Sequence, residues 1–166
     1  MNKVLQANKK RGVGLVEVIV GSAILAVVLF AFTSSLSLYS RANADATNRL
    51  QALYLAEEGL DVVRGLRDAG WATHIATTSV DTDYGISFDP VNSVWAFVSS
   101  PDTVEEFTRT LTFRDVYRDS NDDVVSDPYE TYDPDSRILE VEVTWPGVQD
   151  SQQVRLESIV TNVFEY

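Results

Sequence analysis

Apolar residues follow three patterns along the chain, and each pattern predicts a different element. Residues 18–32, VIVGSAILAVVLFAF, contain no ionisable group, and the apolar character extends back to Val13 and weakly forward to Tyr39. A helix that crosses a bilayer needs about 20 largely apolar residues. The first pattern therefore predicts a transmembrane helix over residues 13–39.

Residues 40–70 are polar overall but carry an apolar stripe. The apolar side chains recur at helical steps of three and four, at Leu50, Leu53, Ala56, Leu60 and Val63. This spacing predicts an amphipathic helix with one apolar face. No proline interrupts residues 13–68, so we expect one continuous helix of about 55 residues and roughly 80 Å. Gly70 is a suitable C-terminal stop for this helix.

Beyond Trp71, apolar and polar residues alternate in short runs. Such alternation predicts strands with one buried and one solvent-facing side. The runs cover residues 84–88, 94–98, 107–113, 139–145 and 154–160. The loop over residues 146–150 predicts a β-hairpin between the last two runs, whereas residues 118–136 are expected to form a long irregular segment.

Together these patterns predict an α+β fold. We expect an antiparallel sheet of about four or five strands, packed on the apolar stripe of the long helix. The sheet would form most of a β-rich globular head over residues 71–166.

The charges are distributed unevenly along the chain. It has 166 residues, a formal net charge of −12 and no cysteine. The cations Lys3, Lys9, Lys10 and Arg11 lie in the first twelve residues, which contain no acid. Cations before an apolar segment predict a cytoplasmic N-terminus and an exported C-terminal part. The acidic remainder argues against direct binding to nucleic acid, and the lack of cysteine excludes disulfides and thiolate metal sites.

The stretch KKRG followed by VGLVEVIV resembles the leader and mature start of the type IV pilin and pseudopilin family. The resemblance covers residues 9 to about 39 closely, and AEEGLDVVRGLRD (56–68) resembles the same region of minor pilins and minor pseudopilins. It implies that a prepilin peptidase cuts after Gly12 on the cytoplasmic side. Residues 1–12 would then be a cytoplasmic leader peptide, and Val13 would become the N-terminus, where methylation is expected.

Glu17 is the one carboxylate inside the apolar segment. An ionised carboxylate in hydrocarbon is costly unless it is paired. Cleavage after Gly12 creates an α-amine on Val13, and residues 13 and 17 are neighbours on a helix. Glu17 is thus able to pair with its own terminus or with that of an adjacent subunit. The resemblance implies the second pairing, as the contact that registers an incoming subunit during assembly.

The resemblance also implies partners and a location. The chain is expected to be a structural, minor subunit of a type IV pilus or a type II secretion pseudopilus, assembled through its hydrophobic N-terminal helix. Its partners would be membrane lipid, other pilin or pseudopilin subunits, the prepilin peptidase and the inner-membrane assembly platform. We expect a single-pass inner-membrane protein with its head outside the cytoplasm, which enters a pilus or pseudopilus on assembly.

Two other interpretations stay open for the N-terminal segment. One is a plain single-pass anchor that carries a non-polymerising, β-rich binding or adhesin module. The other is a secretory signal, for which Ala42-Asn43-Ala44 offers a cleavage site. Enzymatic activity is not expected, because His74 is the only histidine and no nucleophile motif accompanies it.

The most suggestive spacing in the head lies within residues 118–136. Oxygen-bearing side chains occupy relative positions 1, 3, 5, 9 and 12 of a calcium-loop pattern, namely Asp119, Asn121, Asp123, Asp127 and Glu130. Such a loop gathers about six or more oxygen ligands around one Ca²⁺. Position six is Val124 instead of the usual glycine. A calcium site and a solvated acidic hairpin loop are therefore both compatible with the sequence.

Overall fold

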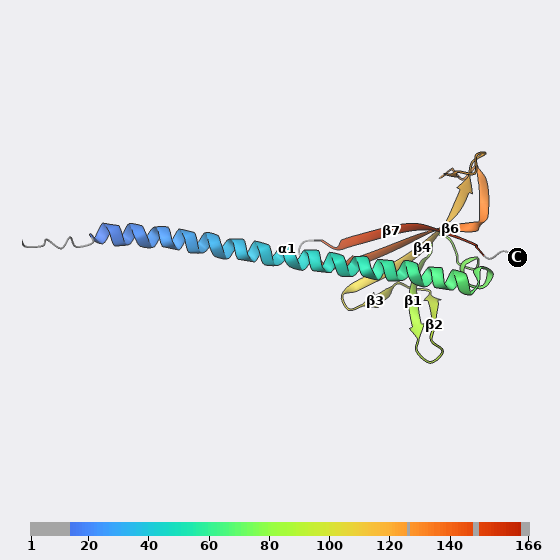
Figure 1. Cartoon of the computed structure of the whole chain (residues 1–166), viewed down its shortest axis with the longest axis horizontal. Helices are drawn as coiled ribbons and strands as arrows, with labels where there is room; N and C mark the ends of the chain where they lie inside the picture. Colours follow the sequence, from blue (N-terminus) through green and yellow to red (C-terminus); the bar gives the residue numbers. More distant parts are fainter. Residues whose placement is uncertain (1–13, 126, 148–149, 164–166) are drawn as a thin grey trace, which may run out of the picture. The chain divides into compact units, whose positions relative to one another are not determined.

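The fold is α+β, with a long N-terminal helix and a C-terminal antiparallel sheet (Figure 1). The computed structural model describes residues 14–125, 127–147 and 150–163. The helical elements are α1 (Leu15–Ala69) and a π-helical turn, η1 (Trp71–Ile75). The strands are β1 (Asp83–Asp89), β2 (Val94–Val98), β3 (Asp102–Val104), β4 (Phe107–Arg118), β5 (Val124–Val125), β6 (Thr131–Trp145) and β7 (Gln152–Thr161). The chain divides into two units, Met1–Ala44 and Asp45–Tyr166.

Helix α1 is continuous over 55 residues and ends where the sequence predicts. Gly70 adopts a φ of 158°, and its amide donates hydrogen bonds to the carbonyl oxygens of Leu66 and Arg67 at 3.2 and 3.1 Å. A Cβ at this position would lie 2.6 Å from the Thr73 hydroxyl oxygen. A residue with a side chain would therefore be strained here, which explains the glycine.

The turn η1 differs from the sequence-based expectation, which places only strands and loops after Trp71. Trp71 and Ile75 are both buried, with 9% and 0% of their surface exposed. Their spacing of four residues places both side chains on the same side of a helical turn. The turn therefore adds two apolar side chains to the core before the first strand begins.

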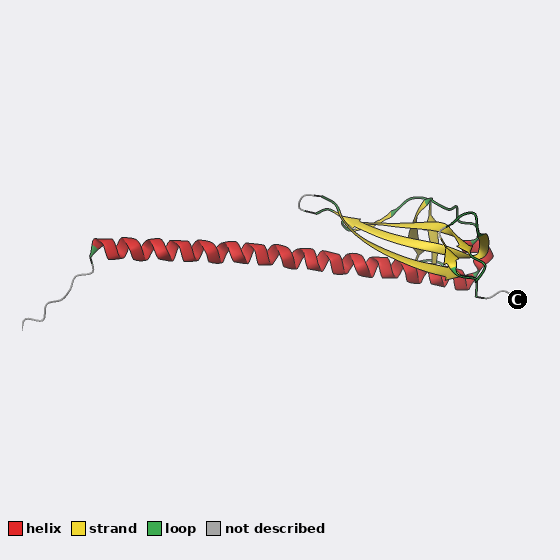
Figure 2. Cartoon of the chain, turned by 90° about the horizontal axis from the view of Figure 1, so that it is seen from above, coloured by secondary structure: helices red, strands yellow, loops and turns green. Residues whose placement is uncertain are grey.

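The sheet is seven-stranded and antiparallel, with the order β2-β1-β4-β6-β7, while β3 and β5 both pair with β4. All five predicted strand runs lie within strands of the structure. The predicted hairpin joins β6 to β7, with Trp145 opposite Gln152. Figure 2 shows the strands beside the C-terminal part of α1.

The prediction of a long irregular segment over residues 118–136 was wrong in part. Strand β5 pairs with the end of β4, and β6 already begins at Thr131. The register shifts in between, since Asp115 is opposite Arg137 but Val116 is opposite Asp133. These polar residues show no apolar alternation from which a strand could be predicted. They form strands because they pair with β4, which the sequence does not show.

The core lies between one face of the sheet and the part of α1 that begins at Ala52. Its largest fully buried apolar side chains are Phe113, Ile75, Leu111, Leu139, Val63, Val116, Val141, Val143 and Val160. Ala56 and Val63 of the predicted stripe are fully buried, but the buried face is rotated from the rest of the stripe. Leu50 is 55% exposed, while Ala52 and Gly59 are buried.

Gly59 explains this rotation. A Cβ added to Gly59 would lie 3.0 Å from Cγ1 of Val141 and 3.3 Å from Cδ of Arg109. The helix thus comes so close to the sheet that a small residue fits best at the point of contact. The predicted stripe left out Ala52 and Gly59, because such small residues stand out little in a pattern of apolar side chains.

Candidate functional site

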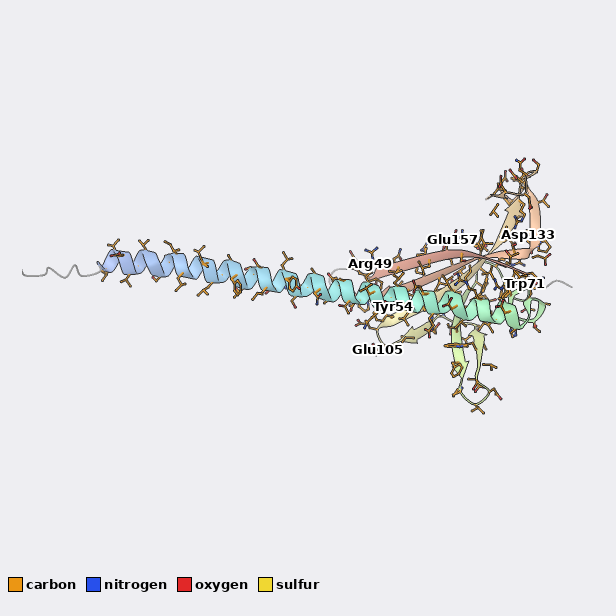
Figure 3. The ribbon with its side chains drawn as sticks, in the orientation of Figure 1. Arg49, Tyr54, Trp71, Glu105, Asp133 and Glu157 are labelled. Atoms are coloured by element: carbon orange, nitrogen blue, oxygen red, sulfur yellow. The ribbon has the colours of Figure 1, made fainter. Side chains whose placement is uncertain are left out.

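The first half of α1 presents its apolar side chains to the outside. Every described residue before Asp45 is exposed, and side chains project from all sides of this part of the helix (Figure 3). Phe30, for example, is 75% exposed and Leu29 is 54% exposed. Within the described ranges, α1 is the helix that is long and apolar enough to cross a membrane.

The hydroxyl groups of Ser22, Thr33, Ser35 and Ser37 form hydrogen bonds within the helix itself. Ser22 donates to the carbonyl oxygen of Ile19 at 2.9 Å, and Ser35 and Ser37 donate to carbonyls one turn earlier. Thr33 donates in the same way to Leu29. Polar groups that bond to their own backbone need no water. These four hydroxyl groups therefore do not prevent the segment from entering an apolar environment.

Glu17 lies in the first turn of α1, and its amide donates to the carbonyl oxygen of Gly14 at 2.9 Å. An acid in the first turn interacts favourably with the helix dipole. Its side chain is exposed and has no ion-pair partner among the described residues. The predicted processing residues Gly12 and Val13 lie outside the described residues, so the pairing of Glu17 with a new N-terminus stays a prediction.

The first three candidate ligands of the predicted calcium loop, Asp119, Asn121 and Asp123, lie in the turn between β4 and β5. One carboxylate oxygen of Asp119 accepts hydrogen bonds from the amides of Asn121 and Asp123 at 2.8 and 3.0 Å. The bonds from Asn121 and then Asp123 lower the pKa of Asp119 below its ordinary value. The Asp119 carboxylate therefore closes the turn of its own loop.

The last two candidate calcium ligands, Asp127 and Glu130, belong to a separate turn that leads into β6. Asp127 accepts a hydrogen bond from the amide of Tyr129 at 3.0 Å, and its carbonyl accepts one from the amide of Glu130. Over residues 14–125, 127–147 and 150–163, no three acidic or histidine side chains form a group that could hold a metal. The structure thus divides the candidate ligands between two turns, and calcium binding stays a prediction.

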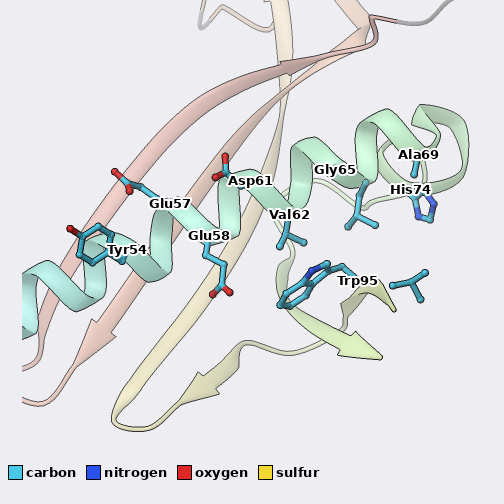
Figure 4. Close-up of a pocket in the computed structure, with 11 residues that line it drawn as sticks. Tyr54, Glu57, Glu58, Asp61, Val62, Gly65, Ala69, His74 and Trp95 are labelled. Atoms are coloured by element: carbon cyan, nitrogen blue, oxygen red, sulfur yellow. The ribbon is translucent and has the colours of Figure 1, made fainter. Parts of the chain in front are cut away.

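A groove runs along α1 on the side of β1, β2 and β3. Its largest part has a volume of about 760 Å³ and is lined by Tyr54, Val62 and Leu66 of the helix and by Trp95 of β2. Figure 4 shows Val62 and Trp95 pointing toward one another across it. Glu57, Glu58 and Asp61 line the same space, so an apolar floor meets an acidic rim.

Two further hollows continue this groove. One has a volume of about 480 Å³ and shares Tyr54 and Glu58 with the first; the other has about 740 Å³ and shares Glu58 and Trp95. The strand side of these hollows contributes Val104 and Glu105. We call the three hollows together the flank groove.

Arg109 joins the helix to the strands that line the flank groove. Its side chain is 3% exposed and forms ion pairs with Asp102 of β3 and Glu58 of α1, both at 2.8 Å. It also donates to the carbonyl oxygen of Leu55 at 3.0 Å. Burial by itself lowers the pKa of Arg109, but the hydrogen bonds to Asp102 and Glu58 raise it overall. One cation thus holds the helix and two strands at a fixed separation.

Sequence reasoning missed both the flank groove and Arg109. The signal for Arg109 was available, because it stands in phase with Phe107, Leu111 and Phe113 on the buried face of β4. An arginine at an apolar position indicates a buried ion pair. The groove had no such signal, since its two walls come from segments far apart in the sequence.

A comparison of the chain with protein-family models, with curated proteins and with solved structures finds no match.

Proposed function

We propose that the chain is a minor structural subunit of a type IV pilus or a type II secretion pseudopilus. The observation that carries the proposal is the composition of α1. Its exposed apolar half, over residues 15–39, contains Glu17 as the only charged residue, and its amphipathic half packs on an antiparallel sheet. The stretch KKRG-VGLVEVIV before and within this helix supports the same family.

The proposed mechanism begins in the membrane. The apolar half of α1 holds the subunit in the inner membrane, with the head outside the cytoplasm because cations precede the helix. Cleavage after Gly12 exposes an amine on Val13. Glu17 of an incoming subunit then pairs with the amine of its neighbour, because an unpaired carboxylate in hydrocarbon is costly. The exposed apolar helices bundle as they leave the lipid.

Mass spectrometry of the mature protein tests the processing step. The proposal expects a chain that starts at Val13, with a mass shift for N-methylation, and replacement of Gly12 by a bulky residue should block cleavage. A start at Met1 would favour the plain anchor. A start at Asp45 would favour a secretory signal.

Glu17→Ala tests the assembly step separately. This variant should be cleaved normally but should enter filaments less efficiently than the wild type, as measured by immunoblotting of sheared surface fractions. Normal incorporation would contradict the pairing of Glu17 with a neighbouring terminus.

The second candidate function is a non-polymerising, membrane-anchored binding module. The flank groove favours it, because an apolar groove on an exposed head is a place for a partner to bind. A start at Met1 together with the absence of filaments that contain the protein would support this alternative.

A further inference from the structure

The flank groove has the chemistry of a docking site, and its exposed aromatic side chain is the first indication. Tyr54 lines two of the three hollows and is 66% exposed. No hydrogen bond or ring contact holds it within the described part of the chain. Exposed tyrosine and tryptophan side chains beside a groove are typical of surfaces that bind other proteins.

The charges that line the flank groove indicate which kind of partner can bind there. Glu57 and Glu105 have no ion-pair or hydrogen-bond partner for their side chains among the described residues, whereas Glu58 is held by Arg109. Among the described residues that line the three hollows, Arg109 is the only arginine or lysine, and its charge is already matched by Asp102 and Glu58. The rim therefore carries uncompensated negative charge.

A second copy of this chain fits the groove poorly. The chain has a formal net charge of −12, with 13 lysines and arginines against 25 acids. Bringing two acidic surfaces together is unfavourable unless cations lie between them. The apolar floor and the acidic rim instead favour a segment of a different protein.

The geometry points to a basic, apolar peptide segment of another protein as the occupant of the flank groove. Its apolar side chains lie on Tyr54, Val62 and Trp95, and its lysine or arginine side chains pair with Glu57 and Glu105. The helix wall from Gln51 to Ala69 is about 27 Å long, which matches roughly eight or nine residues of extended peptide. This inference goes beyond the filament function, because a chain that never polymerises still carries the groove.

Cross-linking of the full-length protein in a non-ionic detergent tests the inference. The probe is a nine-residue peptide of alternating lysine and leucine, coupled with a carbodiimide that joins lysine amines to nearby carboxylates. Peptide mapping by mass spectrometry should find the amide links at Glu57 and Glu105. Links spread evenly over exposed acids such as Glu106 and Glu130 would overturn the proposal. A lysine–serine peptide of equal charge should couple about tenfold less, because it lacks the apolar contacts; equal coupling would also overturn it.

A matched pair of tyrosine variants separates specific docking from general attraction to an acidic protein. Tyr54→Ser should lower the yield at Glu57 about tenfold, whereas Tyr129→Ser, at a residue that is 95% exposed and lies outside the groove, should leave it unchanged. An equal effect of both variants would contradict the proposal. Sedimentation without peptide tests whether a second copy of the chain occupies the groove. If the protein self-associates and Tyr54→Ser dissociates it, the groove is assigned to that second copy instead.

Discussion

The two halves of α1 have the same backbone conformation but opposite surroundings. The half before Asp45 is exposed throughout although most of its side chains are apolar, whereas the half after it buries Ala52, Ala56 and Val63 against the sheet. The backbone is thus helical in both halves although their surroundings differ. The partner of the second half is the chain's own sheet, while the apolar side chains of the first half are exposed in the described part of the chain.

The largest effect is expected where the second half is tied to the sheet. Arg109→Ala should lower the free energy of unfolding of the head by about 3–5 kcal/mol, because it leaves the largely buried Asp102 without its cation. Urea denaturation followed by tryptophan fluorescence measures this loss. The control is Arg64→Ala, which removes an exposed ion pair with Asp61 and should cost no more than about 1 kcal/mol. Equal losses would show that Arg109 does not hold the helix.

The same substitution in both halves of α1 compares them directly. Leu66 is 5% exposed and Leu29 is 54% exposed. Leu66→Ala should destabilise the head by about 3 kcal/mol, since it leaves a cavity in the core. Leu29→Ala should leave head unfolding unchanged when both proteins are compared in detergent by the same denaturation experiment. A clear loss for Leu29→Ala would mean that the first half also contributes to the stability of the head.

Two glycines of the second half should respond with opposite signs. Gly59→Ala should destabilise the head by about 1–2 kcal/mol, because the new methyl group meets Val141. A Cβ added to Gly65 would meet nothing within 4 Å, so Gly65→Ala should stabilise the helix by up to about 1 kcal/mol. Melting temperatures of the two variants measure the difference. The same sign for both would contradict the close approach at Gly59.

The smallest expected effect is a change in how the melting temperature of the head depends on acidic pH. The folded-state pKa of Asp119 lies below its ordinary value of 3.8, so its ionised form contributes stability above that value. The contribution is lost as the pH falls through the lowered pKa. The melting temperature should therefore fall below about pH 4, and Asp119→Asn should make this decline slightly shallower. An unchanged slope would mean that the hydrogen bonds from Asn121 and Asp123 do not favour the ionised carboxylate.

Calcium offers a separate check on the same turn. The sequence places five candidate oxygen ligands at calcium-loop spacing, while the structure divides them between two turns. Calorimetry of the protein with and without millimolar Ca²⁺ decides between a calcium site and a solvated loop. A higher melting temperature with Ca²⁺ would require the two turns to come together around the ion.

Local patterns predicted much of this structure correctly, because they depend on neighbouring residues. The absence of proline and the conformational requirement at Gly70 determined the extent of α1. Alternation of apolar residues located the five main strands. The apolar composition of the first half likewise predicted a helix that is long and apolar enough to cross a membrane.

Contacts between distant residues were decided by the tertiary structure alone. The sequence could not show that the buried face of α1 centres on Gly59, because this depends on how closely Val141 approaches. Nor could it show that Arg109 joins Glu58 to Asp102, or that α1 and β2 enclose a groove beside Trp95. Residue periodicity reports which side of an element is apolar, but the distance between two elements depends on how their side chains fit together in three dimensions.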